Sequence, residues 1–392
     1  MKQMKAKTFV ILMICAFVAA LCVLAGAIRM AQSVWGREHN WRNGYIDVLS
    51  HFTNREEKAN YILQADLPHT AFILGGSKSA ALEPDLLNSY TNEQFYNFFV
   101  GNGNFRDYEL YTNFLLSKYK GTVKEIILHL SSHESETFIH KESDFIPAAI
   151  AMSIPEKLQS EFRFLKKYYL NLQTFFDLYK SRLYEKDSGI TNEYGARTRF
   201  GDDRTQKLLE TAPVKYQNDV FAYWGKYENC IRSLFYGEVY LAGCDKNIEA
   251  LRHIKAMCDS RGVKFTVVIG PTFIAEIYKY KTLRYAEYLK EIVDVCGEVW
   301  NFSGINAIDM NPHNFANGGH YFIFVGDKMI ETMYSTEPNT SDMDSFGILL
   351  TSDNIGAYIE SQREKWRALK AEYDKTGAIT LQGKTDASYL GK

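Results

Sequence analysis

The feature that most constrains the fold of this chain is a regular alternation of short apolar runs with helical patterns that begins at Thr70. Apolar runs occupy Ala71–Leu74, Phe95–Val100, Val123–Leu130, Val263–Ile269 and Val299–Phe302. Between them, helical periodicity starts at Glu83 and covers Tyr108–Tyr119, Lys246–Ser260 and Ile274–Val295. Such alternation is typical of a parallel sheet with helices on both faces. We therefore expect an α/β fold, with five strands in a doubly wound, flavodoxin-like sheet.

The alternation stops between residues 135 and 243, where helical patterning takes over in Pro155–Lys186 and Val220–Phe235. A segment of this kind is better explained as a helical insertion than as a second strand-and-helix unit. The α/β core is therefore expected at residues 69–134 and 244–335. Residues 336–392 are expected to form a C-terminal helix and a tail.

The amino-terminal region contains an uncharged apolar run from Phe9 to Ile28, preceded by three lysines. About twenty such residues can cross a hydrocarbon core about 30 Å thick. The lysines predict a cytoplasmic tail at 1–8, a signal anchor at 9–28 and an extracytoplasmic remainder that starts with a stalk and first helix at 29–68. This organisation places the chain in the cell membrane as a single-pass protein. A cleaved signal peptide is the alternative, because Ala25–Ala27 has the small residues of a cleavage site.

The charge and the cysteines exclude some classes of function. The formal net charge is −2, and no basic stripe interleaves with the aromatic residues, so nucleic acid is not an expected partner. No Cys-x-x-Cys spacing occurs, which argues against a zinc ribbon or a thioredoxin-like site. Outside the apolar run lie Cys230, Cys244, Cys258 and Cys296, and an external location permits disulfides among them without requiring any.

Two segments some 240 positions apart contain the residues that are the best candidates for catalysis. The first is an apolar strand that runs into Gly75, Gly76 and Ser77, and the second is a polar loop that contains Asn317 and His320 ahead of a helix. Ligands bind open parallel sheets at the carboxyl ends of the strands. A serine and a histidine at that edge are a candidate nucleophile and base. The alternative role for Ser77 is to cap a helix.

These segments resemble the SGNH, or GDSL-like, hydrolase superfamily, and within it the membrane-anchored acyl-transfer proteins such as the D-alanyl-transfer protein of teichoic-acid synthesis. The resemblance implies that Ser77 is the nucleophile and His320 the base, with the amides of Ser77 and Gly103 in an oxyanion hole. Gly76 stands where the family has an aspartate before the serine. Asn317 occupies the position of the family's catalytic aspartate, and Asp309 on the same loop is a possible substitute acid.

The remaining site residues are expected to contact substrate. They lie after the nucleophile (Lys78), in the loop after the second apolar run (Gly101 and Asn104) and after the third apolar run (His133). A metal site at His129 and His133 is disfavoured, because the preceding residues have the pattern of a strand. No metal, nucleotide or other cofactor is expected.

The resemblance further implies a function at the cell envelope. It predicts an extracytoplasmic serine esterase or O-acyltransferase that modifies a cell-envelope polysaccharide or polymer through an acyl-serine intermediate, with a membrane-bound acyltransferase as a possible partner. The alternative is a non-catalytic protein of the same fold that binds glycan or acts as a scaffold in an envelope acylation complex. A soluble secreted esterase is a third reading, and it requires cleavage near Ala27.

Overall fold

The computed structural model describes residues 6–34, 58, 59, 62, 69–131, 150, 153–164, 235, 243–273, 283–311, 314–317, 319–334, 337–377 and 379. The chain divides into two compact units, which are described separately. Unit 1 comprises Met1–Ala65 and Phe145–Ser188, and unit 2 comprises Asp66–Asp144 and Gly189–Lys392.

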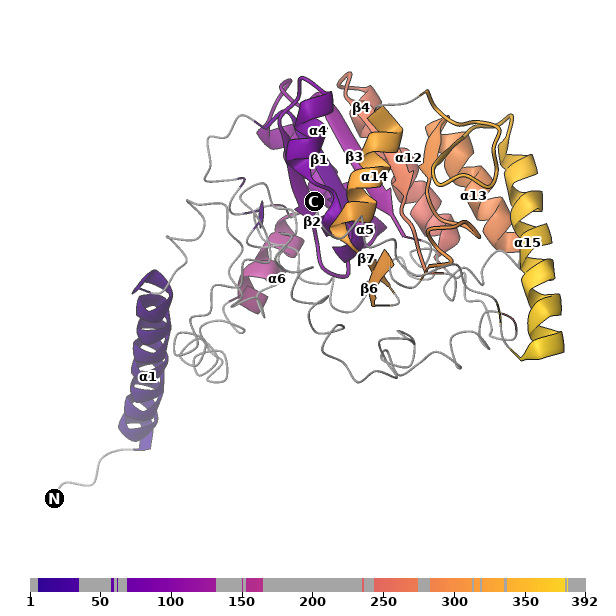
Figure 1. The fold of residues 1–392 in the computed structure, drawn as a ribbon. Coiled ribbons are helices and arrows are strands. Elements are labelled where there is room, and N and C mark those ends of the chain that lie inside the picture. Colours follow the sequence, from indigo (N-terminus) through magenta and orange to yellow (C-terminus); the bar gives the residue numbers. More distant parts are fainter. Residues whose placement is uncertain are drawn as a thin grey trace. The chain divides into compact units, whose positions relative to one another are not determined.

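Unit 2 is built on a six-stranded sheet in the order β2-β1-β3-β4-β5-β8 (Figure 1). The strands are β1 (Ala71–Gly75), β2 (Phe95–Phe99), β3 (Glu125–Leu130), β4 (Lys264–Ile269), β5 (Val299–Asn301) and β8 (Ile348–Leu350). The first five pair in parallel, whereas β8 pairs antiparallel with β5. The predicted α/β class is therefore confirmed, but the sheet is mixed and has one more strand than the five expected.

The helices of unit 2 form two groups. They are η1 (Ser77–Ala81), α4 (Pro84–Tyr90), α5 (Phe105–Lys118), α12 (Cys244–Asp259), α13 (Leu283–Cys296), α14 (Ile323–Tyr334) and α15 (Ile355–Thr376). Helix α12 packs between α5 and α13, and α13 also contacts α15. Helix α14 packs against α4 and η1. A separate antiparallel pair, β6 (Phe315–Asn317) and β7 (His320–Tyr321), immediately precedes α14.

The central strands are buried along their whole length, which explains why they read as continuous apolar runs. Every residue of β1, β2 and β3 is buried. Strands covered on both faces select apolar side chains at successive positions rather than at alternate ones. The core therefore lies on both sides of β1 and β3, and the carboxyl ends of these strands meet at one edge of the sheet.

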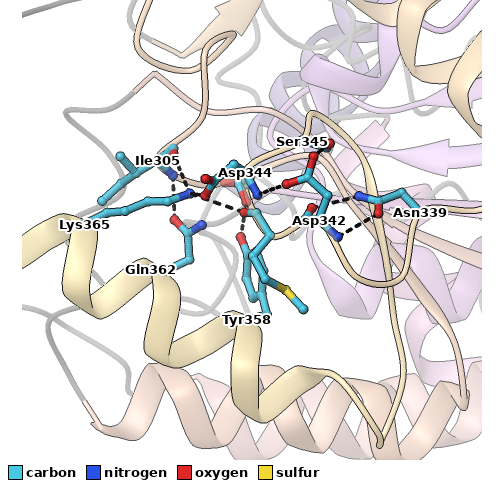
Figure 2. A network of polar contacts seen from close by, with 10 residues as sticks. Ile305, Asn339, Asp342, Asp344, Ser345, Tyr358, Gln362 and Lys365 are labelled. Carbon is cyan, nitrogen blue, oxygen red and sulfur yellow. Dashed lines mark hydrogen bonds and ion pairs between the residues drawn. The ribbon is translucent and has the colours of Figure 1, made fainter.

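A polar network fixes the loop after β5 against α15 (Figure 2). The Tyr358 hydroxyl donates to the Ser303 carbonyl at 2.6 Å, and the Ile305 amide donates to Gln362 Oε1 at 2.6 Å. Lys365 Nζ donates to the Ile305 carbonyl at 3.1 Å and forms an ion pair with Asp344. These three side chains of α15 follow one another on one side of the helix, so they hold the loop that also carries Asp309.

Unit 1 contains α1 (Ala6–Val34) and α6 (Ile154–Phe164). Among the residues described, no helix combines the length and apolarity of a membrane crossing, so the signal anchor predicted at 9–28 has no support from the structure. Helix α6 falls at the start of the helical stretch predicted at Pro155–Lys186. The rest of that stretch, and the second one up to residue 234, lie outside the described residues.

Two described cysteines of unit 2, Cys258 and Cys296, are free thiols. Cys244 and Cys258 are buried on α12, and Cys296 is half-buried at the end of α13. Burial raises the pKa of both Cys258 and Cys296 to about 12. Cys230 lies outside the described residues.

Candidate active site

Ser77 and His320 meet at the carboxyl end of β1. Ser77 Oγ lies 2.7 Å from His320 Nε2, although the two residues are 243 positions apart in the chain. Both side chains are partly exposed, so the hydrogen bond lies within reach of a substrate. The structure thus brings together the two residues that the sequence suggested as nucleophile and base.

The backbone at the end of β1 turns at two buried glycines. A Cβ added at Gly75 would lie 2.6 Å from Ser79 Oγ and 2.8 Å from the His129 carbonyl oxygen, so no side chain fits there. Gly76 is the N-cap residue of η1 and no side chain caps that helix, so Ser77 does not have the capping role considered as its alternative. As the first residue of η1, Ser77 has an amide with no acceptor within the helix.

Asn97 of β2 fastens η1 to the sheet. It is fully buried, and its Nδ2 donates to the carbonyls of Ser79 at 2.8 Å and Leu82 at 2.9 Å. Its Oδ1 accepts from the Phe99 amide at 3.1 Å. The sequence analysis did not identify this residue. A polar residue in the middle of the aromatic run Phe95–Phe99 was the available signal, because a buried amide needs partners.

The β6–β7 pair and α14 hold His320. Residue 317 pairs with His320, and Phe315 pairs with Tyr321. Helix α14 then approaches η1 closely, since a Cβ added at Gly326 would lie 2.1 Å from the Ala81 carbonyl oxygen. Helix α14, which follows the strand that carries His320, is therefore in direct contact with η1, which carries Ser77, through residues without bulky side chains.

Three ionisable or polar side chains lie buried next to the Ser77–His320 pair. His129, at the end of β3, is fully buried and its Nε2 lies 3.0 Å from the Tyr321 hydroxyl. Burial, together with the positive charge of Lys78, lowers the pKa of His129 to about 3. Lys78 itself is only 5% exposed. The predicted contact of Lys78 with an anionic substrate therefore stays a prediction, and it concerns a side chain that is buried in this structure.

Asp309, the possible substitute acid, is also fully buried. Its Oδ2 accepts from the Gly304 amide at 2.8 Å, and its own amide donates to Asn306 Oδ1 at 2.9 Å. Burial raises its pKa well above the usual range, opposed by backbone hydrogen bonds and by the charge of Lys78. These hydrogen bonds join Asp309 to its own loop, and a further backbone hydrogen bond joins it to Thr272 after β4.

The remaining predicted residues are distributed around the same edge. The Gly103 amide donates to the Val100 carbonyl at 3.1 Å, so a role in an oxyanion hole would require this turn to open. Asn104 is buried and caps α5 through Oδ1, which accepts from the Arg106 and Asp107 amides. Gly101 lies in the same loop. His133 and the side chain of Asn317 lie outside the described residues, so their roles stay predictions.

The described residues contain no cluster of three or more potential metal-binding side chains. No protein-family model matches the chain, and no curated protein matches it in sequence. The chemistry of the site therefore rests on its own geometry: a serine hydroxyl with an adjacent imidazole acceptor at the edge of a sheet. This arrangement can activate an oxygen nucleophile.

Proposed function

We propose that this chain is an SGNH-like serine esterase or O-acyltransferase that works through an acyl-serine intermediate. The observation that carries the proposal is the distance of 2.7 Å between Ser77 Oγ and His320 Nε2. A nucleophile and a base at hydrogen-bond distance, partly exposed at the carboxyl edge of a parallel sheet, form the minimum unit of this chemistry.

The mechanism follows from these two side chains. His320 Nε2 accepts the hydroxyl proton of Ser77 while Oγ forms a bond to an ester carbonyl carbon. The Ser77 amide stabilises the negative charge on the carbonyl oxygen. The protonated imidazole then gives its proton to the leaving alcohol as the ester bond breaks. In the second half of the reaction, water or a sugar hydroxyl gives a proton to His320 and its oxygen bonds to the acyl carbon. The bond between this carbon and Ser77 Oγ then breaks, and Oγ takes the proton back from His320.

The sheet topology supports the SGNH-like assignment. The order β2-β1-β3-β4-β5 corresponds to the doubly wound, flavodoxin-like order. The chain moves outward from β1 to β2 and then in the opposite direction through β3, β4 and β5. Right-handed connections place α4 on one face and α5, α12 and α13 on the other. The carboxyl end of β1, which carries Ser77, lies where this direction reverses.

The proposed substrate is a cell-envelope polysaccharide or polymer, with a membrane-bound acyltransferase as a partner. Support for this substrate class comes from the motif resemblance. We further propose that α1 attaches the chain to a membrane, with unit 2 on the extracytoplasmic side. Nine large apolar side chains between Phe9 and Val23 are 51–73% exposed, and a lipid bilayer would cover an apolar surface of this kind. Flotation of the full chain with phospholipid vesicles, compared with an Ile14→Lys, Phe17→Lys variant, tests the attachment.

The test of the catalytic proposal is covalent labelling with a fluorophosphonate, which reacts with activated serines. The full chain in detergent should gain the mass of one probe less HF, because fluoride leaves as the serine oxygen bonds to phosphorus, and Ser77→Ala and His320→Ala should each abolish this gain. Ser89→Ala is a matched control, because its hydroxyl donates to the Leu86 carbonyl on the exposed side of α4. Labelling that persists in Ser77→Ala would refute the assignment of the nucleophile.

A second function, non-catalytic binding of envelope glycan, is favoured by one observation, the asparagine at position 317. An amide orients an imidazole but does not stabilise its charge, and the Asp-to-Asn change in a serine-protease triad lowers turnover about ten-thousandfold. Asn317→Asp should therefore accelerate labelling at least about tenfold if the site is catalytic. A folded chain that stays unlabelled with either residue at 317 would favour the binding function.

A further inference from the structure

A buried tyrosine–histidine pair lies directly behind the candidate base. Tyr321 is 1% exposed and His129 is fully buried, and the phenol oxygen lies 3.0 Å from His129 Nε2. Their ring centroids are 6.1 Å apart. The proposed reaction needs only Ser77 and His320, so this polar pair has no role in it as written.

The tyrosine of this pair is the next residue in the chain after the candidate base. Tyr321 follows His320 immediately in β7, and successive side chains of a strand point to opposite sides. His320 points to Ser77 on η1, while Tyr321 points to His129 on β3. The hydrogen bond at Tyr321 therefore contributes to the orientation of the two-residue strand that presents the candidate base.

The strand β7 needs such an attachment. It pairs with β6 in a two-stranded sheet of its own, and this ladder does not join the six-stranded sheet. The Tyr321–His129 bond connects β7 to β3, the strand beside β1 in the main sheet. It thus connects the hairpin to the part of the main sheet from which the chain enters η1 and Ser77.

The interior is shaped to admit the histidine. A Cβ added at Gly270, after β4, would lie 2.0 Å from His129 Nε2, so the ring occupies the space that a side chain at this position would fill. Burial and the nearby charge of Lys78 keep the ring neutral at physiological pH. In a neutral imidazole one ring nitrogen carries a proton and the other accepts, so Nε2 of His129 and the phenol of Tyr321 form one hydrogen bond whose direction follows the tautomer.

We propose that Tyr321 is a positioning residue, which acts through His320 by means of its hydrogen bond to His129. The inference rests on the proposed function, because the group it positions is the proposed base. Displacement of a reacting group by about 1 Å can cost about a hundredfold in rate, so loss of this attachment should slow acylation without changing how the probe binds.

The test compares Tyr321→Phe with Tyr334→Phe in the full chain. Tyr334 is a matched control, since its phenol donates to Glu125 Oε1 at the opposite end of the same strand β3. The rate of labelling at saturating fluorophosphonate should fall between about 10- and 100-fold in Tyr321→Phe, with half-saturation unchanged. It should stay within about twofold of the wild type in Tyr334→Phe. Equal rates in the two variants would overturn the proposal.

A second measurement separates this inference from the proposed function. Nitrogen-15 NMR of the histidine rings reports the Ser77–His320 hydrogen bond directly, whether or not the fluorophosphonate reacts with the chain. The His320 ring signal, assigned by its absence in His320→Ala, should shift in Tyr321→Phe and not in Tyr334→Phe. A wild-type chain that is not labelled would refute the proposed enzymatic function. An unshifted His320 signal in Tyr321→Phe would refute the positioning role of Tyr321.

The double variant His129→Leu, Tyr321→Phe covers the case in which Tyr321→Phe alone does not fold. Removing both partners of a buried hydrogen bond leaves no unsatisfied group and is tolerated better than removing one. The double variant should label between about 10- and 100-fold more slowly than the wild type, because it also lacks the contact between β7 and β3. Labelling at the wild-type rate would contradict the proposal.

Discussion

Lys78 follows the candidate nucleophile and yet has only 5% of its surface exposed. The positive charge of this buried side chain lowers the pKa of both His129 and Asp309. The site therefore contains a fixed positive charge behind the reacting atoms. Its consequence at the residue scale is that the buried ring of His129 is held in its neutral state, because burial and this charge both lower its pKa.

Burial of histidine makes stability depend on pH, and His69 allows the cleanest test. Burial lowers the pKa of His69 to about 4 from its ordinary value of 6.5. Between these values the unfolded chain binds more protons, so the stability that the neutral ring contributes is complete above pH 6.5 and is lost as the pH falls toward 4. In His69→Phe, the slope of the unfolding free energy against pH should fall by up to about 1.4 kcal/mol per unit in this window.

Urea unfolding at several pH values across that window measures the slope. The ring centroids of His69 and Tyr96 are 5.0 Å apart, and phenylalanine at position 69 keeps an aromatic ring there. His129 has the same sign of pKa change, so some slope should remain in the variant. An unchanged slope would show that His69 does not carry the effect.

At the scale of elements, the site depends on how closely α14 approaches η1. A Cβ at Gly326 would lie 2.1 Å from the Ala81 carbonyl oxygen, whereas a Cβ at Gly356 on α15 would meet nothing within 4 Å. These two helical glycines therefore form a matched pair for substitution.

Gly326→Ala should push α14 away from η1, destabilise the chain by about 1–3 kcal/mol and slow fluorophosphonate labelling. Gly356→Ala should instead stabilise it by about 0.5–1 kcal/mol and leave labelling unchanged, because alanine is the better helix former. Thermal unfolding and labelling rates of the two variants check both statements. Equal melting temperatures would contradict the close contact.

The elements that the sequence predicted well are those with strong local patterns. The five apolar runs correspond to β1–β5 with boundaries shifted by at most two residues. Strand β8 was missed because a run as short as Phe346–Leu350 does not distinguish a strand from a loop, and its pairing with β5 is set by tertiary contact. The hairpin β6–β7 was missed for the same reason.

The site was predictable in part. Ser77 and His320 stood out because each follows a recognisable local pattern, a strand with a glycine turn or a polar loop before a helix. Asn97, Tyr321 and His129 did not stand out as parts of this site. Their roles depend on the residues that they contact in the folded chain. Contacts of this kind have no spacing along the chain that a pattern could reveal.

At the scale of the whole molecule, the thiols report on folding. Cys258 and Cys296 are covered by α12, α13 and their neighbours, and burial raises the pKa of each to about 12. At about pH 8 the reactive thiolate is therefore scarce in the folded chain, while an exposed cysteine with a pKa of about 8.5 ionises readily.

Iodoacetamide at about pH 8 should leave Cys258 and Cys296 unmodified in the native full chain and alkylate both in guanidinium chloride. Peptide mass spectrometry measures the modification at each cysteine separately. A peptide pair lighter by two hydrogens would reveal a disulfide between them and contradict the free thiols of the structure. Equal modification with and without denaturant would contradict their burial.

The hydrogen bond between Ser77 and His320 also has a consequence for biosynthesis. Its partners are 243 positions apart, and contacts between such distant residues form late in folding because a long loop must close first. When the ribosome has completed β1 and η1, the base has not yet been synthesised. A nascent or truncated chain that ends before β7 therefore holds Ser77 without its candidate base, and the hydrogen bond between Ser77 and His320 forms only after β7 and α14 have joined the core.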